Sequence, residues 1–216
     1  MKFRTRVLPV VALAAALAGC AREGELVVNQ GVGITSVLTS CPSVGIPDYL
    51  GDVTTFSGDG AQTYANLDVS ATMTNLRTTC DDTGDKVYSE ANFDIVALRK
   101  DAGGARTVTL PYFVTVLRGG TAVVTKRVGE VQLDFADGSS RAEGSGKAGS
   151  FVDRAAASLP EDVREKITRK RRAGDVDAAL DPLADPDVKA AIARSRFEML
   201  VGFQLTEDQL KYNATK

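Results

Sequence analysis

The chain has 216 residues, with 26 Lys and Arg, 28 Asp and Glu, three Cys and neither His nor Trp. Without His it holds no Ser-His-Asp triad, no Cys-His pair and no HExxH zinc site, which excludes the commonest hydrolase chemistries. A hydrophobic fraction of 44% and a charged fraction of 25% are typical of a globular protein and disfavour disordered or fibrous classes.

The N-terminus predicts a secretory signal peptide over residues 1–19. Its first basic residues are Lys2, Arg4 and Arg6. The apolar run that follows, over residues 7–18, is shorter than the roughly 20 residues that a membrane-spanning helix needs. Residues 17–20, with the sequence LAGC, resemble the lipobox of bacterial lipoproteins. The resemblance implies cleavage before Cys20 and acyl chains, palmitate among them, on that residue; a plain signal peptide that ends near a Cys is the alternative.

Residues 20–40 would then be the lipidated Cys and a tether, because two or more acyl chains hold a protein stably in a membrane. Ala21 follows Cys20, and in Gram-negative lipoproteins a residue other than Asp at this place implies sorting to the outer membrane. The expected location is the inner leaflet of that membrane, facing the periplasm. The signal peptide carries basic residues and no acidic ones, so the mature chain is more acidic than the whole, whose net charge is −2. We therefore expect no nucleic-acid partner.

Cys41 and Cys80 are the two cysteines that remain after Cys20. An exported protein meets an oxidising compartment, which favours a disulfide between them. A catalytic thiol and a metal pair are the alternatives, and both are disfavoured because neither Cys has a visible basic or imidazole partner. We expect no metal and no cofactor.

Apolar and polar residues alternate over four segments, which predicts strands with one buried face. The segments are 67–74, 91–98, 108–116 and 123–135. Gly119-Gly120 separates the last two and predicts a two-residue hairpin turn, because both central positions of such a turn favour positive φ. Val96 and Leu98 suggest that the second strand is covered on both faces near its end.

A further short strand begins at Cys41 and ends at Pro47. If it pairs antiparallel with the strand over residues 67–76, its start lies beside the end of that strand. Cys41 then lies beside Cys80, at the usual disulfide Cα separation of about 5.5 to 6 Å.

Residues 152–195 change to helical patterns and predict an insertion of two to three short helices. Residues 158–161 fit a capping box for a first helix that ends before Gly174. Residues 176–180 are a second candidate. Asp185-Pro186 opens a third helix, whose inward residues would be Val188, Ala191 and Ile192. A late strand follows over residues 196–205, and residues 206–209 fit the capping box of a terminal helix.

The expected fold is therefore mainly β: an antiparallel immunoglobulin-like or fibronectin-like sandwich in a single domain over residues 41–216, interrupted by the helical insertion. Short strands at near-regular spacing with polar turns are typical of such a sandwich.

Several polar motifs are candidate sites. Residues 144–147 lack the first Gly and the final Ser or Thr of a phosphate-binding loop, so they are interpreted as a turn, as are the glycine pairs in residues 31–33 and 58–60. Residues 81–85 hold three Asp around a Gly, which predicts a tight turn or, as the alternative, a weak cation site. No acidic pair stands at a separation that indicates catalysis, and no catalytic residue is assigned.

Basic residues between positions 164 and 172 form the strongest local charge feature. The candidates for contact with an anionic partner are Lys166, Arg169, Lys170, Arg171 and Arg172. Such a partner would be lipid phosphate, lipopolysaccharide or an acidic protein. The alternative is a solvated helix face, since cations suit a helix C-terminus.

Three short segments outside the signal peptide, residues 41–46, 110–114 and 201–205, resemble an uncharacterised family of Gram-negative envelope lipoproteins. The resemblance covers residues 1–135 and the late strand. It implies a periplasm-facing, disulfide-bearing β-sandwich and no assigned activity. The leading hypothesis is a non-enzymatic module that binds or scaffolds another envelope protein. The alternatives are a carrier of lipid or another small ligand, and a His-free hydrolase that uses acids alone or a Ser-Lys pair.

Overall fold

The computed structural model describes residues 39–58, 61–172, 174–177 and 179–216. Residues 39–216 form one compact unit. The predicted signal peptide, the lipid site at Cys20 and the turn at residues 31–33 lie outside the described residues.

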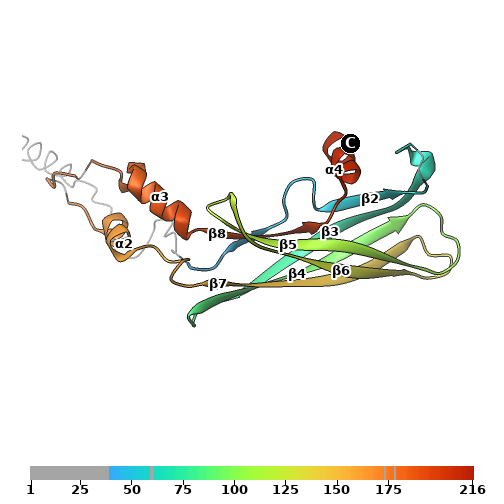
Figure 1. The fold of residues 1–216 in the computed structure, drawn as a ribbon, viewed down its shortest axis with the longest axis horizontal. Coiled ribbons are helices and arrows are strands. Elements are labelled where there is room, and N and C mark those ends of the chain that lie inside the picture. Colours follow the sequence, from blue (N-terminus) through green and yellow to red (C-terminus); the bar gives the residue numbers. More distant parts are fainter. Residues whose placement is uncertain (1–38, 59–60, 173, 178) are drawn as a thin grey trace, which may run out of the picture. The chain divides into compact units, whose positions relative to one another are not determined.

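Two four-stranded sheets stack on each other and confirm the predicted mainly-β sandwich (Figure 1). The first sheet has the order β1 (Ser43–Gly45), β8 (Phe197–Phe203), β5 (Arg106–Arg118), β6 (Ala122–Phe135). The second has the order β2 (Asp52–Phe56), β3 (Leu67–Asp81), β4 (Lys86–Arg99), β7 (Arg141–Asp153). All neighbours are antiparallel except β1 and β8, which are parallel. The predicted late strand is therefore present, and β2 is a strand that the sequence pattern did not reveal.

The alternating segments place their apolar sides between the sheets, as predicted. The core they form includes Val69, Ala71, Met73, Phe93, Ile95, Ala97, Leu110, Val114, Val116, Val131, Leu133 and Phe135. The hairpin between β5 and β6 is also confirmed. Gly119 and Gly120 have φ values of +62° and +77°, and the Thr121 amide donates to the Arg118 carbonyl at 3.4 Å.

Residues 144–147 are not a turn, because they lie in the middle of β7 and pair with β4. Gly146 faces Phe93 across the ladder, and a Cβ there would lie 2.2 Å from the Phe93 ring. Gly129 faces Tyr112 in the same way, with a distance of 2.6 Å. The two rings meet edge to face at 5.1 Å. These glycines leave room for aromatic rings of the neighbouring strand, so they mark close packing.

The end of β4 also differs from expectation, because Leu98 is 52% exposed and Arg99 points inward with 6% exposure. The Arg99 guanidinium donates to the carbonyls of Gly103, Gly104, Ala136 and Ser139 at 2.7–3.0 Å. It also lies over the Phe135 ring. The strict period of two along β4 puts residue 99 on the inner face, and the surrounding loops supply acceptors for its charge.

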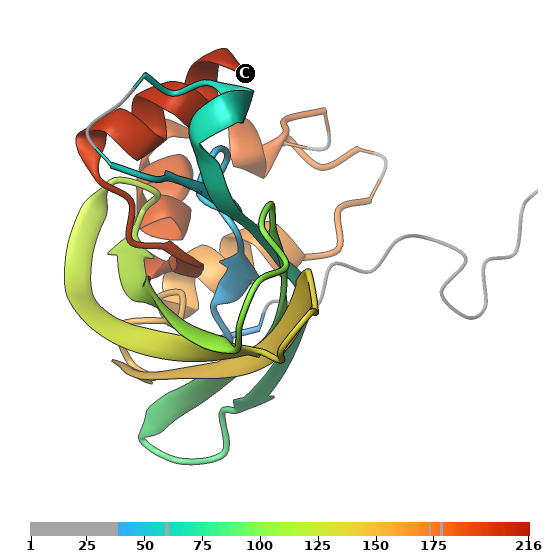
Figure 2. The same cartoon turned by 90° about the vertical axis from the view of Figure 1, so that its right-hand side faces the viewer.

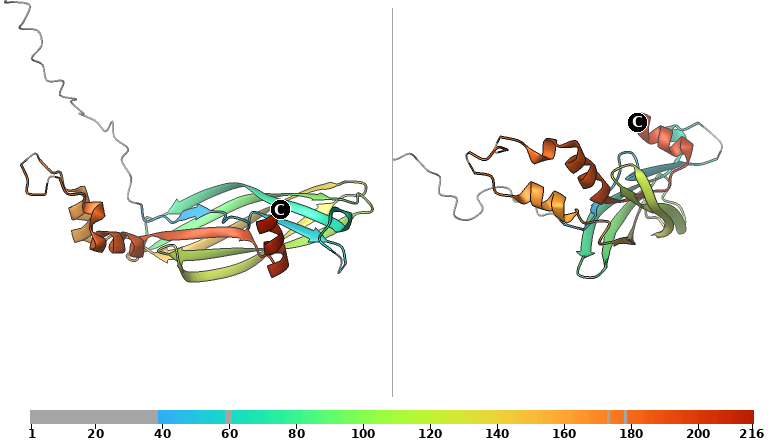
Figure 3. Two further views of the ribbon diagram at one scale, coloured as in Figure 1. Left: turned by 90° about the horizontal axis from the view of Figure 1, so that it is seen from above. Right: turned by 60° about the vertical axis from the view of Figure 1, so that its left-hand side comes forward.

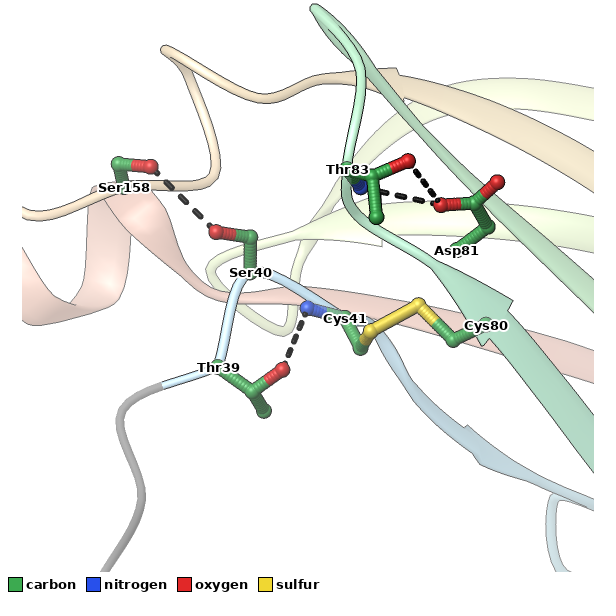
Figure 4. The surroundings of a disulfide bond; sticks show 7 residues. All are labelled: Thr39, Ser40, Cys41, Cys80, Asp81, Thr83 and Ser158. Atoms are coloured by element: carbon green, nitrogen blue, oxygen red, sulfur yellow. Dashed lines mark hydrogen bonds between the residues drawn. A yellow bond between two sulfur atoms is a disulfide. The ribbon is translucent and has the colours of Figure 1, made fainter.

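The Cys41–Cys80 disulfide forms, with a Cα separation of 6.1 Å. The strand pairing expected around it is wrong. β1 pairs parallel with β8, and Cys80 lies within β3, which continues to Asp81. The bridge therefore links the segment before β1 in one sheet to β3 in the other (Figure 4).

Four helical segments follow β7 in the described chain: α2 (Glu161–Thr168), the 3-10 helix η2 (Pro182–Ala184), α3 (Pro186–Ser195) and α4 (Glu207–Thr215). A 3-10 turn, η1 (Tyr64–Asn66), precedes β3. Within the described ranges, none of the helices combines the length and apolarity needed to cross a bilayer. Figure 2 shows α4 beside the start of β3, and its Asn213 amide donates to the Tyr49 and Asp52 carbonyls.

Two helix predictions are confirmed. Asp185 caps α3 by accepting from the Asp187 amide, and Val188 and Ala191 are buried. The capping box at Thr206 and Gln209 opens α4.

The predicted first helix forms as α2 and ends before Gly174, but its capping box at residues 158–161 is wrong. Pro160 is the N-cap of α2, and the Ser158 hydroxyl donates to the Arg154 carbonyl. The predicted second helix is also wrong, because residues 176–177 and 179–180, the described part of that segment, are not helical. Val176 and Leu180 are exposed there, so they do not pack a face that would stabilise a helix. The segment leads instead into η2.

Candidate functional site

The insertion between β7 and β8, residues 154–196, carries α2, η2 and α3. Figure 3 shows α2 and α3 at the end of the sandwich where β7 stops and β8 starts. The disulfide lies at this same end. The Ser40 hydroxyl, one residue before Cys41, is 3.4 Å from the Ser158 hydroxyl at the base of the insertion (Figure 4). The first described residues therefore enter the sandwich beside the insertion.

A cavity of about 670 Å³ lies within the insertion, and we call it the insertion groove. Its lining comes from α2, from the segment that follows α2 and from the η2–α3 junction. The apolar lining residues are Leu180, Pro182, Ala184 and Pro186. The charged ones are Asp162, Glu165, Lys166, Arg169, Arg171, Asp177, Asp181 and Asp185. A volume of this size is ordinary for a ligand or peptide site.

The basic residues singled out in the sequence gather here, but three of the five are paired with carboxylates. Lys166 bonds to Asp185, and Arg169 bonds to Asp177. Arg171 lies 3.6 Å from the same Asp177 carboxylate and also donates to the Lys166 carbonyl. In each pair the carboxylate neutralises the cation within the insertion. These three cations therefore attract an external anion only weakly.

Lys170 and Arg172 differ from these three. Both side chains are exposed, and neither forms an ion pair with a described carboxylate. α2 ends at Thr168, so the run of basic residues continues beyond the helix. Of the five candidates, these two are the cations left open to an anionic partner.

Asp185 connects two helices of the insertion. The Lys166 ammonium and, next, the Asp187 backbone amide hold the pKa of this carboxyl below its usual value. The carboxylate therefore stays ionised while it caps α3 and bonds to α2. The ionised carboxylate thus connects α2 to the start of α3 where both line the groove.

Large apolar side chains remain in water around the groove. Val176, Leu180 and Leu183 are 105%, 67% and 47% exposed. α2 adds a face that is only half covered, because none of its residues is fully buried. Burying one Val or Leu side chain is worth about 1.5–3 kcal/mol. Exposed apolar residues that cluster beside a cavity are typical of interaction sites.

The acidic turn at residues 81–85 is built by local hydrogen bonds. The Asp81 carboxylate accepts from the Thr83 amide at 3.0 Å and from its hydroxyl at 2.7 Å. The hydrogen bond from the Thr83 backbone amide and, next, the one from its hydroxyl lower the pKa of Asp81. In the part of the chain that the structure describes, no three His, Cys, Asp or Glu residues come together as metal ligands. The geometry supports the interpretation as a turn.

A polar network on the outer face of the second sheet was not foreseen. Glu90 accepts from the Tyr88 hydroxyl at 2.8 Å and lies 2.9 Å from the Lys147 ammonium. Bonding to Lys147 and Tyr88 lowers the pKa of Glu90, and the bond to Glu90 raises the pKa of Tyr88. Tyr88 also stacks against Phe151. These are cross-strand contacts on an open face, and they join β4 to β7.

Comparison with protein-family models, curated proteins and solved structures found no match for this chain. The lipoprotein hypothesis therefore rests on the N-terminal residues alone.

Proposed function

We propose that this protein is a lipid-anchored, non-enzymatic component of the Gram-negative cell envelope that binds another envelope protein through the insertion groove. The observation that carries the proposal is the set of exposed apolar side chains beside the groove, Val176, Leu180 and Leu183. They remain in water at a cost unless a partner covers them.

The charges of the groove favour a protein over a phosphate-bearing lipid. Three of its cations are already paired with carboxylates, so a phosphate would have to displace Asp177 or Asp185. An apolar helix or segment of a partner protein needs no such exchange and would be recognised by its shape and side chains.

The anchor follows from the lipobox and would keep the insertion near the membrane. Thr39 and Ser40 lie beside the base of the insertion, since Ser40 is close to Ser158 and Thr39 accepts from the Cys41 amide. The chain from Cys20 to Thr39 can extend to about 65 Å at most. With acyl chains on Cys20, the groove would meet partners close to the outer membrane.

Replacing Cys20 with Ser should release the protein from the membrane without unfolding residues 39–216. The reason is that the acyl chains would be lost while the disulfide and the core stay intact. Membrane fractionation and incorporation of labelled palmitate measure the first effect, and thermal unfolding measures the second. Tight membrane association of the variant, or absence of palmitate from the wild type, would show the lipobox interpretation to be wrong.

A photo-crosslinking amino acid at position 183 should give one adduct of defined mass in intact cells. Substituting Leu180→Asp in the same chain should abolish it, because a carboxylate in the groove would have to be desolvated on binding. Leu180 is 67% exposed, so this variant should fold normally.

The matched control carries the crosslinker at Thr72, which is exposed on β3 of the sandwich. The proposal fails if position 72 gives the same adduct as position 183, or if Leu180→Asp leaves the adduct unchanged.

The alternative functions are a His-free hydrolase and a carrier of a small ligand. A His-free hydrolase would need an acid positioned for catalysis in a cleft. In the groove, Asp177 is engaged by arginines, and Asp181 and Asp185 cap helical segments. Asp162 and Glu165 also line the groove, but no observation places either beside a second reactive group. We assign none of them a catalytic role. A ligand carrier is favoured by one observation, a second cavity at the end of the sandwich.

A further inference from the structure

We propose that this second cavity binds a single-chain fatty acid, with the carboxylate held by Lys86 and Arg118. The inference stands apart from the insertion groove, and either site can exist without the other. We call the cavity the edge slot. It has a volume of about 310 Å³ and is lined by Lys86, Arg118, Val124, Phe151, Val152, Asp153, Ala156 and Phe197.

The slot lies where the outer strands of the two sheets face each other. β6 ends the first sheet and β7 ends the second, and their described ladders run only to β5 and β4 respectively. Val124 comes from the start of β6, and Phe151 and Val152 come from the end of β7. Lys86 and Arg118 come from the next strands inward, β4 and β5. The slot therefore lies at the end of the sandwich that carries the insertion, on the side of β6 and β7.

The apolar residues that line the slot include both core and exposed side chains. Phe197 and Val152 belong to the core and are each 6% exposed. Val124 and Phe151 are 55% and 62% exposed. The buried and exposed apolar side chains together would contact a methylene chain along its length, part of it between the strands and part of it along the surface. The volume is at the lower end of the usual range for ligand pockets, so it suits one chain.

The charges of the slot complement a carboxylate. Lys86 and Arg118 make no ion pair with any carboxylate in the described ranges, which contrasts with the paired cations of the insertion groove. Asp153 is the single acid of the lining, so the lining has a net charge of +1. That balance favours one monoanion over a phosphate with two charges.

Arg118 is held in place before any ligand arrives. Its Nε donates to the Arg194 carbonyl at 2.6 Å, and its guanidinium lies 5.7 Å from the centre of the Phe197 ring. The hairpin that follows is fastened by the Gly119 amide, which donates to the Arg196 carbonyl. The Nε bond uses one of the five guanidinium N–H donors and leaves the terminal nitrogens for a carboxylate. Such preorganisation lowers the cost of binding.

The test measures binding of dansyl-undecanoate to the purified full-length protein after removal of bound lipid. We expect saturable fluorescence that laurate displaces and that methyl laurate, the uncharged ester, does not. Dodecyl phosphate serves as a second competitor, because it offers a chain of similar length on a phosphomonoester whose charge at pH 7 is about −1.5 to −2. We expect it to compete less well than laurate.

Arg118→Gln and Lys86→Gln should each weaken binding about tenfold or more, because each removes a charge-assisted hydrogen bond. Lys189→Gln, an exposed lysine on α3, is the matched control and should bind as the wild type does. Lys86 and Lys189 are exposed, so thermal unfolding of their Gln variants should be unchanged. Arg118→Gln also loses the Nε bond to the Arg194 carbonyl, so we expect a slightly lower unfolding temperature there, with the fold retained. The proposal is overturned by no saturable binding, by equal displacement by methyl laurate, by stronger displacement by dodecyl phosphate than by laurate, or by wild-type affinity in both slot variants.

Discussion

Replacing Cys41 and Cys80 together with Ala is expected to lower the free energy of unfolding by about 4 kcal/mol. The bridge joins residues 39 positions apart, and opening it frees the unfolded chain to explore many more conformations. Cys80 is exposed and Cys41 is half-buried, so little packing is lost. The effect should therefore come mainly from the unfolded state.

Urea denaturation in oxidising buffer measures this effect. The wild type in strong reductant is the matched control and should unfold at the same urea concentration as the double variant. An unchanged midpoint for the double variant in oxidising buffer would contradict the stabilising role of the bridge.

Replacing Arg99 with Met should cost about 3 kcal/mol of unfolding free energy. Met fills much of the same volume but leaves the carbonyls of Gly103, Gly104, Ala136 and Ser139 without their donor. Unsatisfied buried acceptors are costly. Arg99→Lys should lose most of the same stability, because one ammonium cannot serve a fan of four acceptors as a guanidinium does.

Arg141→Met is the control for Arg99→Met, because Arg141 is an exposed arginine near the same loops, paired only with Glu143. Its effect should stay within about 0.5 kcal/mol. Hydrogen exchange adds a local readout: amides of residues 100–105 and 136–140 should lose protection in Arg99→Met. Equal stability of the two Met variants would show that Arg99 does not hold these loops.

Only part of each candidate site could be predicted from the order of residues in the sequence. The run of basic residues from Lys166 to Arg172 is visible in the sequence, but the carboxylates that pair with it are not. Asp177 and Asp185 come into range only when the chain folds back after α2. The edge slot was not foreseen at all, because Lys86 and Arg118 come from strands in different sheets. No local pattern signals that two such residues share a cavity.

The sequence by itself determined the features that depend on neighbouring residues. Alternation over β3 to β6 placed one face of each strand in the core, and the pair Gly119-Gly120 formed the hairpin. Thr206 and Gln209 capped α4. The disulfide was also predictable, since assigning Cys20 to the predicted lipid site leaves Cys41 and Cys80 to pair. These features follow from side-chain period, backbone preference and composition.

Only the tertiary structure decided the features that depend on distant partners. β7 could not be predicted because its glycines suggest a turn, whereas Gly146 and Gly149 leave room for the rings of Phe93 and Tyr88, and Gly144 leaves room for Val131 and Leu133. The pairing of β1 with β8 could not be predicted, because these two strands lie far apart in the sequence and no local pattern specifies which strand pairs with which. The strand period places Arg99 on the inner face, but its burial is stable only because a loop distant in sequence supplies acceptors for its charge. The absent His excludes the commonest catalytic groups. The fold placed exposed apolar residues in the insertion and brought Lys86 and Arg118, from interior strands of the two sheets, to one cavity, and the proposed binding roles rest on these placements.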